Sequence, residues 1–166
     1  MKAIVAVDKF WGIGKNNGLL FHIPEDMAFF KSTTLNKVVV MGINTLKSFP
    51  QGKPLKNRVN IVLHSTGEKI DDCFVVKNLE ELKGVLREYN SDDVFVIGGA
   101  KVYGELIEYC SEIYVTKVDA DGNAEVFFRD LDKDENWECT SKSGVINSNG
   151  YNIRFTVYKN LNLKPF

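Results

Sequence analysis

Residues 94–103 read VFVIGGAKVY, an apolar run that ends in two glycines and passes into a helical pattern. The run from Val94 to Ile97 predicts a strand buried on both faces, the kind found in parallel sheets. Gly98 and Gly99 would let a ligand approach the backbone closely, and a helix over 101–107 would offer free N–H groups to a phosphate. A glycine pair alone is equally consistent with a plain strand-to-helix turn.

Strands and helices alternate along the chain around this stretch. The expected strands are 3–7, 38–41, 59–63, 74–76, 94–97 and 113–118, and the expected helices are one from Pro24, then 44–48, 79–89 with Asn78 as its N-cap, and 101–107. This alternation indicates parallel strands joined by helical crossovers. Two further strands, 137–142 and 151–158, would add an antiparallel hairpin at one edge. We therefore expect a single domain over residues 1–166 with a three-layer αβα fold: a mixed, mostly parallel sheet of about eight strands flanked by about four helices.

Composition excludes several classes of protein. With 166 residues, 44% of them hydrophobic and 26% charged, the chain suits one globular domain. A formal net charge of -1 lacks the basic surplus of a nucleic-acid-binding protein. The three cysteines are widely spaced, so we expect free thiols, and neither they nor the two histidines have the spacing of a metal site. The apolar run after Lys2 is too short for a signal peptide or a membrane span, which favours the cytoplasm.

Two stretches near the N-terminus carry candidate functional residues. Residues 9–23 combine three glycines with an Asn-Asn pair, which predicts a long loop, and loops of that length in compact domains are usually functional. Asp26 follows in the first turn of a helix, beside the apolar residues Met27 and Phe30. If it points inward, its carboxylate suits a ligand with two adjacent N–H donors; if it points outward, it only stabilises the helix dipole.

Donor groups also follow several of the predicted strands. These residues are Asn44, Thr45, His64, Ser65, Thr66 and Lys101. In open α/β sheets ligands bind beyond the carboxyl ends of the strands, so three such ends suit a dinucleotide with several phosphates. Arg58, with Lys53 and Lys56 nearby, would hold an anionic substrate tail or else belong to an ordinary charged loop.

Five segments together resemble the dihydrofolate reductase family, in matching order across essentially the whole chain. They are WGIGKNNGLLFHIPEDMAFFKSTT (11–34), VVVMGINTLKSF (38–49), GKPLKNRVNIVL (52–63), VFVIGGAKVY (94–103) and EIYVTKVDAD (112–121). The resemblance implies an oxidoreductase that transfers a hydride from NADPH to 7,8-dihydrofolate, with protonation of pterin N5, to give 5,6,7,8-tetrahydrofolate. It implies a cytoplasmic monomer without a nucleic-acid or membrane partner.

The resemblance also assigns roles to residues at matching positions. Asp26 would bind the pyrimidine edge of the pterin and help to deliver a proton to N5 of that ring. Thr116 would form a hydrogen bond with Asp26. Arg58 would pair bidentately with the α-carboxylate of the substrate. The pterin pocket would be lined by Ile4, Val5, Ala6, Met27, Phe30 and Ile97. NADPH would be held by Ala6, Ile13, Leu19, Gly42, Asn44, Thr45, His64, Ser65, Gly98, Gly99, Lys101, Val102 and Tyr103. The family pattern further implies a cis bond between the paired glycines and a loop at 16–19 that closes over the nicotinamide.

The sequence departs from the family pattern at several positions. Phe21 replaces a usual Trp, Ile43 and Lys101 replace arginines, and Glu125 replaces an Asp that often braces the loop. Leu19 and Leu20 also stand where many bacterial members have Met-Pro or Leu-Pro. Two alternatives stay open: a reductase of the same fold that acts on a riboflavin-pathway pyrimidine, and a pterin- or nucleotide-binding module without catalysis.

Overall fold

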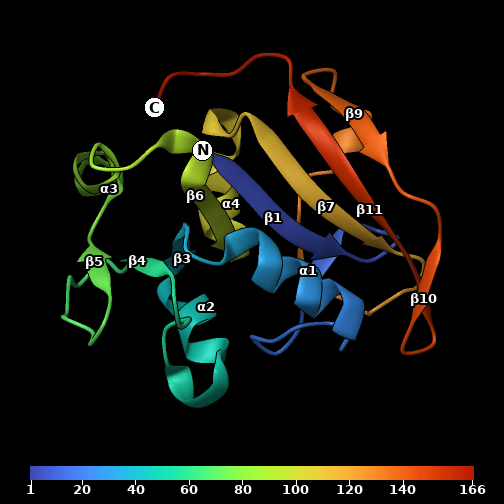
Figure 1. The fold of residues 1–166 in the computed structure, drawn as a ribbon, viewed down its shortest axis with the longest axis horizontal. Helices are drawn as coiled ribbons and strands as arrows, with labels where there is room; N and C mark the ends of the chain where they lie inside the picture. The colour runs from blue at the N-terminus through green and yellow to red at the C-terminus, as the bar shows by residue number, and fades with distance from the viewer.

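The computed structural model describes residues 1–166, and strands alternate with helices along it as the sequence predicts (Figure 1). The α-helices are α1 Pro24–Thr34, α2 Ile43–Ser48, α3 Leu79–Leu86 and α4 Ala100–Leu106. The strands are β1 Lys2–Val7, β2 Gly12–Gly14, β3 Val38–Gly42, β4 Val59–Leu63, β5 Phe74–Val76, β6 Val94–Gly98, β7 Glu112–Val118, β8 Val126–Phe127, β9 Trp137–Lys142, β10 Ile146–Ser148 and β11 Tyr151–Asn160. Short 3-10 turns lie at η1 Pro50–Gly52, η2 Ser91–Asp93, η3 Ile107–Tyr109 and η4 Leu131–Lys133.

The main sheet has nine strands in the order β10-β11-β7-β1-β6-β3-β4-β5, with β9 also paired to β11. Strands β5, β4, β3, β6, β1 and β7 run parallel, and β11 returns antiparallel against β7. The mixed, mostly parallel sheet and its antiparallel edge are therefore confirmed. Strand β10 was not predicted; it shares the outer edge of β11 with β9.

The helices cover both faces of the sheet, which gives the three layers. Alternate residues of β3 show this best, since Val38 and Val40 belong to the larger core that also holds Leu82 of α3 and Leu106 of α4. The intervening Val39 lies in the smaller core under α2. Burial on both faces explains why this strand reads as a continuous apolar run. Figure 1 shows α1 in front of the sheet and α4 behind it.

Local signals set the starts of α1 and α3. Pro24 occupies the first turn of α1, where its missing N–H costs nothing. The Asn78 side chain accepts a hydrogen bond of 2.9 Å from the backbone N–H of Glu81 and so caps α3 as predicted. Helix α3 ends at Leu86, so the predicted extension to residue 89 is wrong. None of the helices has both the length and the apolar character needed to cross a bilayer.

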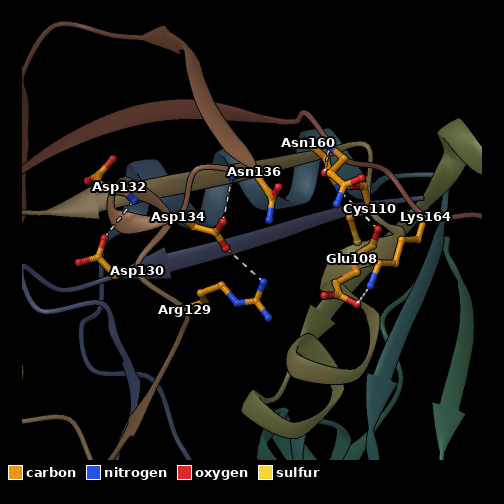
Figure 2. A network of polar contacts seen from close by, with 10 residues as sticks. Glu108, Cys110, Arg129, Asp130, Asp132, Asp134, Asn136, Asn160 and Lys164 are labelled. Carbon is orange, nitrogen blue, oxygen red and sulfur yellow. Dashed lines mark hydrogen bonds and ion pairs between the residues drawn. The ribbon is translucent and has the colours of Figure 1, made fainter.

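The C-terminal tail is fixed at the amino ends of the parallel strands. The Asn160 side chain donates to the carbonyl oxygens of Glu108 and Cys110 at 3.2 and 3.0 Å, and Lys164 pairs with Glu108 at 3.0 Å (Figure 2). In the same view Arg129 pairs with Asp134 at 3.3 Å, in the loop before β9. Strand β11 runs antiparallel to β7, so its C-terminal end lies at the amino ends of the parallel strands. The tail therefore stays away from their carboxyl ends, where ligands bind in sheets of this kind.

The cysteines are free thiols, as predicted. Cys110 is buried, Cys73 is half-buried and Cys139 is exposed. Burial raises the pKa of the Cys110 thiol to about 12, so it stays protonated at neutral pH.

Candidate active site

One large cleft, of about 1680 Å³, runs along the carboxyl ends of the parallel strands. It is lined by all but one of the residues to which the family resemblance assigns a role: Ile4, Val5, Ala6, Ile13, Leu19, Asp26, Met27, Phe30, Gly42, Asn44, Thr45, Arg58, His64, Ser65, Ile97, Gly98, Gly99, Lys101, Val102 and Tyr103. The exception, Thr116, lies behind Asp26 and is 2% exposed. The structure thus brings residues that lie up to about a hundred positions apart in the sequence, from Ile4 to Tyr103, into a single groove.

Asp26 points inward, which decides between the two alternatives left by the sequence. Its Oδ1 accepts a hydrogen bond of 2.6 Å from the hydroxyl of Thr116 on β7. Burial raises the pKa of the Asp26 carboxyl above its ordinary value, and the hydrogen bond from Thr116 offsets part of that rise. A half-buried carboxylate with a tuned pKa in a cleft can bind adjacent N–H donors and take part in proton transfer.

The walls beside Asp26 are apolar and come from three elements. Strand β1 supplies residues 4–6, helix α1 supplies Met27 and Phe30, and β6 supplies Ile97. The hydroxyl of buried Tyr103 donates to the carbonyl oxygen of Ile4 at 2.7 Å. Burial raises the pKa of Tyr103, so this phenol is neutral and holds α4 against β1. The result is an apolar slot suited to an aromatic ring.

Arg58 lies at one end of the cleft and is held by three acceptors. Its Nε donates to Thr34 Oγ1 at 3.2 Å, and its two terminal nitrogens donate to the carbonyl oxygens of Lys56 at 2.8 Å and Lys31 at 3.4 Å. Burial lowers the pKa of the guanidinium from its ordinary value. An arginine stays protonated even so, and its remaining N–H groups can face an anion. The side chains of Lys53 and Lys56 do not line the cleft, so Arg58 is the member of this basic group that can hold a substrate tail there.

The glycine pair lies further along the cleft, beside the starts of two helices. The Gly98–Gly99 peptide is cis, as the family resemblance implies. A Cβ built at Gly98 would lie 3.3 Å from Thr45 Oγ1, and one at Gly42 would lie 3.2 Å from Val102 Cγ2. Neither α2 nor α4 has a side-chain N-cap, so their first N–H groups remain available to another acceptor.

Basic and hydroxyl side chains that follow β4, β5 and β6 line another part of the cleft. His64, Ser65 and Lys101 line the cleft as predicted, and Lys77, which was not predicted, joins them. The stem of Lys77 runs across Gly67, where a Cβ would lie 2.4 Å from Lys77 Cε. Its placement depends on this tertiary contact, which the sequence does not reveal.

Thr66 was expected among these donors, but it does not line the cleft. Its hydroxyl instead accepts a hydrogen bond from the backbone N–H of Glu68 at 3.3 Å. Ile43, at the position where many family members have Arg, lines the cleft and packs against the small core under α2.

The loop over 9–23 covers one side of the cleft and is not entirely irregular. Its residues 12–14 form β2, which pairs with β8. The N–H of Asn16 donates to Glu125 Oε1 at 2.8 Å, and the side chain of Asn17 donates to the carbonyl oxygen of Asn44 at 3.2 Å. The position that often carries a bracing Asp in the family therefore makes a loop contact here through Glu125.

Sequence reasoning missed the apolar residues at the Arg58 end. Phe49 and Leu55 line the cleft on either side of η1. The only signal for them was an apolar side chain on each side of the polar PQGKP segment.

Comparison with known proteins gives a consistent result. A family model described as dihydrofolate reductase matches residues 1–160. A dihydrofolate reductase of Bacillus subtilis (strain 168) is 34% identical over 162 residues, which cover 96% of this chain and 94% of that protein. A dihydrofolate reductase of Schistosoma mansoni is 34% identical over 180 residues, which cover 95% of each chain. One of Buchnera aphidicola subsp. Acyrthosiphon pisum (strain APS) is 30% identical over 156 residues, which cover 93% of this chain and 95% of that protein. Taken with the cleft that joins an inward-facing acid to a cis glycine pair, these matches show that the chain belongs to the dihydrofolate reductase family, enzymes that reduce dihydrofolate to tetrahydrofolate.

Proposed function

We propose that the cofactor of this reductase is NADPH and that the reaction takes place between Asp26 and the paired glycines. The observation that carries this proposal is that Asp26, held from behind by Thr116, and the Gly98–Gly99 bond face the same cleft. A hydride donor and a pterin placed side by side in one groove satisfy the proximity that hydride transfer requires.

The glycine end of the cleft fits a dinucleotide. Side chains at Gly42 or Gly98 would fill the space beside Val102 and Thr45, so these glycines keep the backbone accessible to a phosphate. His64, Ser65, Lys77 and Lys101 offer hydrogen-bond donors at the far end, which favours a cofactor with a 2′-phosphate despite the apolar Ile43. When bound, NADPH supplies the hydride.

The apolar slot fits the pterin ring. Residues 4–6, Met27, Phe30 and Ile97 enclose it, and the Asp26 carboxylate accepts two N–H groups from its pyrimidine edge. Ile13, Leu19 and Tyr103 face the nicotinamide side of the slot and exclude water from it. The chain thereby orients the two rings for transfer to C6 of the pterin.

Asp26 and Thr116 also serve the proton step. Asp26 binds the pyrimidine edge, too far from N5 for direct transfer, so a water molecule carries the proton to N5. The raised pKa of Asp26 brings the carboxyl closer to the pH at which proton exchange with such a water is efficient. Thr116 orients the carboxylate through its hydroxyl.

Arg58 binds the acidic tail of the substrate. Its guanidinium is held in place by Thr34 and by two backbone carbonyl oxygens, so little side-chain entropy is lost when it pairs with a carboxylate. Phe49 and Leu55 pack against the aromatic linker between pterin and tail.

The same proposal covers the organisation of the chain. We place residues 1–166 in one domain, because one continuous sheet runs through them and the family match spans residues 1–160. We also expect a cytoplasmic monomer, which size-exclusion chromatography and cell fractionation test.

A steady-state assay tests the function directly. We expect NADPH absorbance to fall only when dihydrofolate is present, with a much lower kcat/KM for NADH. A ribosylamino-pyrimidine should give no turnover. Turnover of that pyrimidine without turnover of dihydrofolate would favour the alternative reductase, and binding of both ligands without any oxidation would favour a non-catalytic module.

A further inference from the structure

A buried carboxylate beside the cleft has no part in the reaction proposed above. Asp8 directly follows β1, at the start of the loop that covers the cleft, and is 3% exposed. No lysine or arginine forms an ion pair with it. Burying a carboxylate is costly unless its oxygens are hydrogen-bonded, so the contacts of this one indicate what it does.

The two carboxylate oxygens of Asp8 bind two different segments of the chain. Oδ1 accepts from the backbone N–H groups of Phe10 at 2.9 Å and Gly12 at 2.8 Å, within its own loop. Oδ2 accepts from the backbone N–H of Gly122 at 3.0 Å, on the segment that follows β7. The side chain therefore links a local turn to a distant one, and its hydrogen bonds are charge-assisted.

The same two segments meet through a run of backbone contacts. Lys9 N donates to the carbonyl oxygen of Ala120 at 3.0 Å, and Glu125 N donates to that of Gly14 at 2.8 Å. Glycine is needed at position 12, where the two segments come closest, because a Cβ there would lie 2.3 Å from Ala124 Cβ and 2.9 Å from both Asp8 oxygens. Asp8 thus lies between the covering loop and the segment after β7, with a residue from each packed against it.

We propose that Asp8 is a positioning residue for hydride transfer. Its carboxylate fixes the base of the covering loop to the 120–128 segment, so that the following residues 13–19 keep their place along the cleft. This rests on the proposed function, since it assigns those residues to the nicotinamide side. Asp8 does not line the cleft, so it acts only through the loop.

Asp8→Asn should keep the hydrogen bonds within the loop and remove the one to Gly122. The amide oxygen can still accept from Phe10 and Gly12, but the amide nitrogen then faces the Gly122 N–H, and two donors cannot bond. Asp121→Asn is the matched control. Asp121 lies in the same segment and accepts only from Asn123 within its own turn, at 2.9 Å, so the same chemical change removes no link between segments.

The kinetic test measures hydride transfer by stopped flow and ligand affinities by fluorescence titration. We expect Asp8→Asn to lower the transfer rate and the affinity for NADPH about tenfold each, the size of one lost hydrogen bond to a charged group. The affinities for dihydrofolate and for 2′,5′-ADP, which lacks the nicotinamide, should stay unchanged. Equal behaviour of the two variants, or an equal loss for every ligand, would overturn the proposal.

A double-mutant cycle tests whether the loop transmits the effect. Glu125→Ala removes the second side-chain link between the segments, the one to Asn16. Because both links hold the same loop, the losses in transfer rate should be non-additive when the two changes are combined. Additive losses would contradict a shared route.

Hydrogen exchange on the unmodified chain covers the case in which Asp8→Asn does not fold. We expect the Gly122 amide to exchange at least about tenfold more slowly than the exposed loop amide of Gly144. Similar rates would mean that the carboxylate does not hold Gly122, and the proposal would fail. This readout and the NADPH titration need no turnover, so a chain that failed to reduce dihydrofolate would refute the proposed function without deciding the role of Asp8.

Discussion

The hydroxyl of Thr116 lies 2.6 Å from Oδ1 of Asp26, although 90 residues separate the two in the sequence. Thr116 is paired with Ala6 in the parallel register of β7 and β1, so the same strand pair that carries the apolar slot also carries the partner of the acid. The acid on α1 and the sheet beneath it are thereby joined at one point of the cleft. The first predictions concern that contact.

Asp26→Asn should lower the rate of hydride transfer about 100-fold or more at about pH 7, the size of effect usual for loss of a group in general acid catalysis. The loss should be smaller at about pH 5, where part of the substrate is already protonated in solution. Single-turnover rates across this range provide the measurement. A deficit of the same size at every pH would show that Asp26 has no part in protonation.

The same substitution should raise the melting temperature at neutral pH. Since burial raises the pKa of Asp26 above the ordinary value of 3.8, the folded chain binds more protons than the unfolded chain between these two pKa values. The free energy of unfolding therefore falls as pH rises through that window and stays lower above it. Wild type and Asp26→Asn should melt together at about pH 3 and separate at about pH 7, with the variant higher. A pH-independent difference between them would contradict the raised pKa.

Thr116→Val removes only the hydroxyl that bonds Asp26. The pKa of Asp26 should rise further, because this hydrogen bond favours the ionised carboxyl, and the pH-rate profile should move to higher pH. We expect a loss of about 1.5–3 kcal/mol in the free energy of unfolding at neutral pH, as for hydrogen bonds to charged groups. Thr116→Ser, which keeps a hydroxyl, should restore the profile; a Ser variant that behaved like Val would point to packing instead.

Arg58→Lys should raise the KM for dihydrofolate about 10- to 100-fold and leave kcat and the KM for NADPH nearly unchanged, since it removes a hydrogen bond to a charged group. Lysine cannot reproduce the planar pair of donors. Two controls sharpen the test. A dihydropterin without the glutamate tail should react equally well with both proteins, and Lys53→Met, which changes a nearby charge outside the cleft, should have little effect.

Lys101→Met should raise the KM for NADPH about tenfold without changing that for NADH, because it removes one charge-assisted contact to the 2′-phosphate. Lys77→Met should act in the same direction. Lys47→Met is the matched control, since Lys47 is an exposed lysine of α2 that does not line the cleft. Equal losses with NADPH and NADH would mean that these lysines do not bind the 2′-phosphate.

Much of this molecule could be predicted because the deciding interactions are local. The predicted strands 59–63 and 74–76 match β4 and β5 residue for residue, since a polar residue follows each run, His64 after Leu63 and Lys77 after Val76. The Asn78 cap and Pro24 at the start of α1 are contacts or torsion limits within one helical turn. The family resemblance supplied the roles in the site, and residues predicted from it line one cleft.

The rest depended on contacts between distant parts of the chain, which periodicity and turn chemistry do not encode. Strand β8 is two residues long and exists only because Gly12 and Gly14 lie beside it. Asp8 reads as an ordinary acid after a strand, and only packing places Gly122 against its carboxylate. By itself the sequence determined which segments become strands and helices and which side chains are available for chemistry, because backbone propensity and hydrophobic pattern act over a few residues. Only the tertiary structure decided that Asp26 faces inward, that Thr66 does not line the cleft and that Lys77 does, because each of these orientations depends on what the folded chain places beside that side chain.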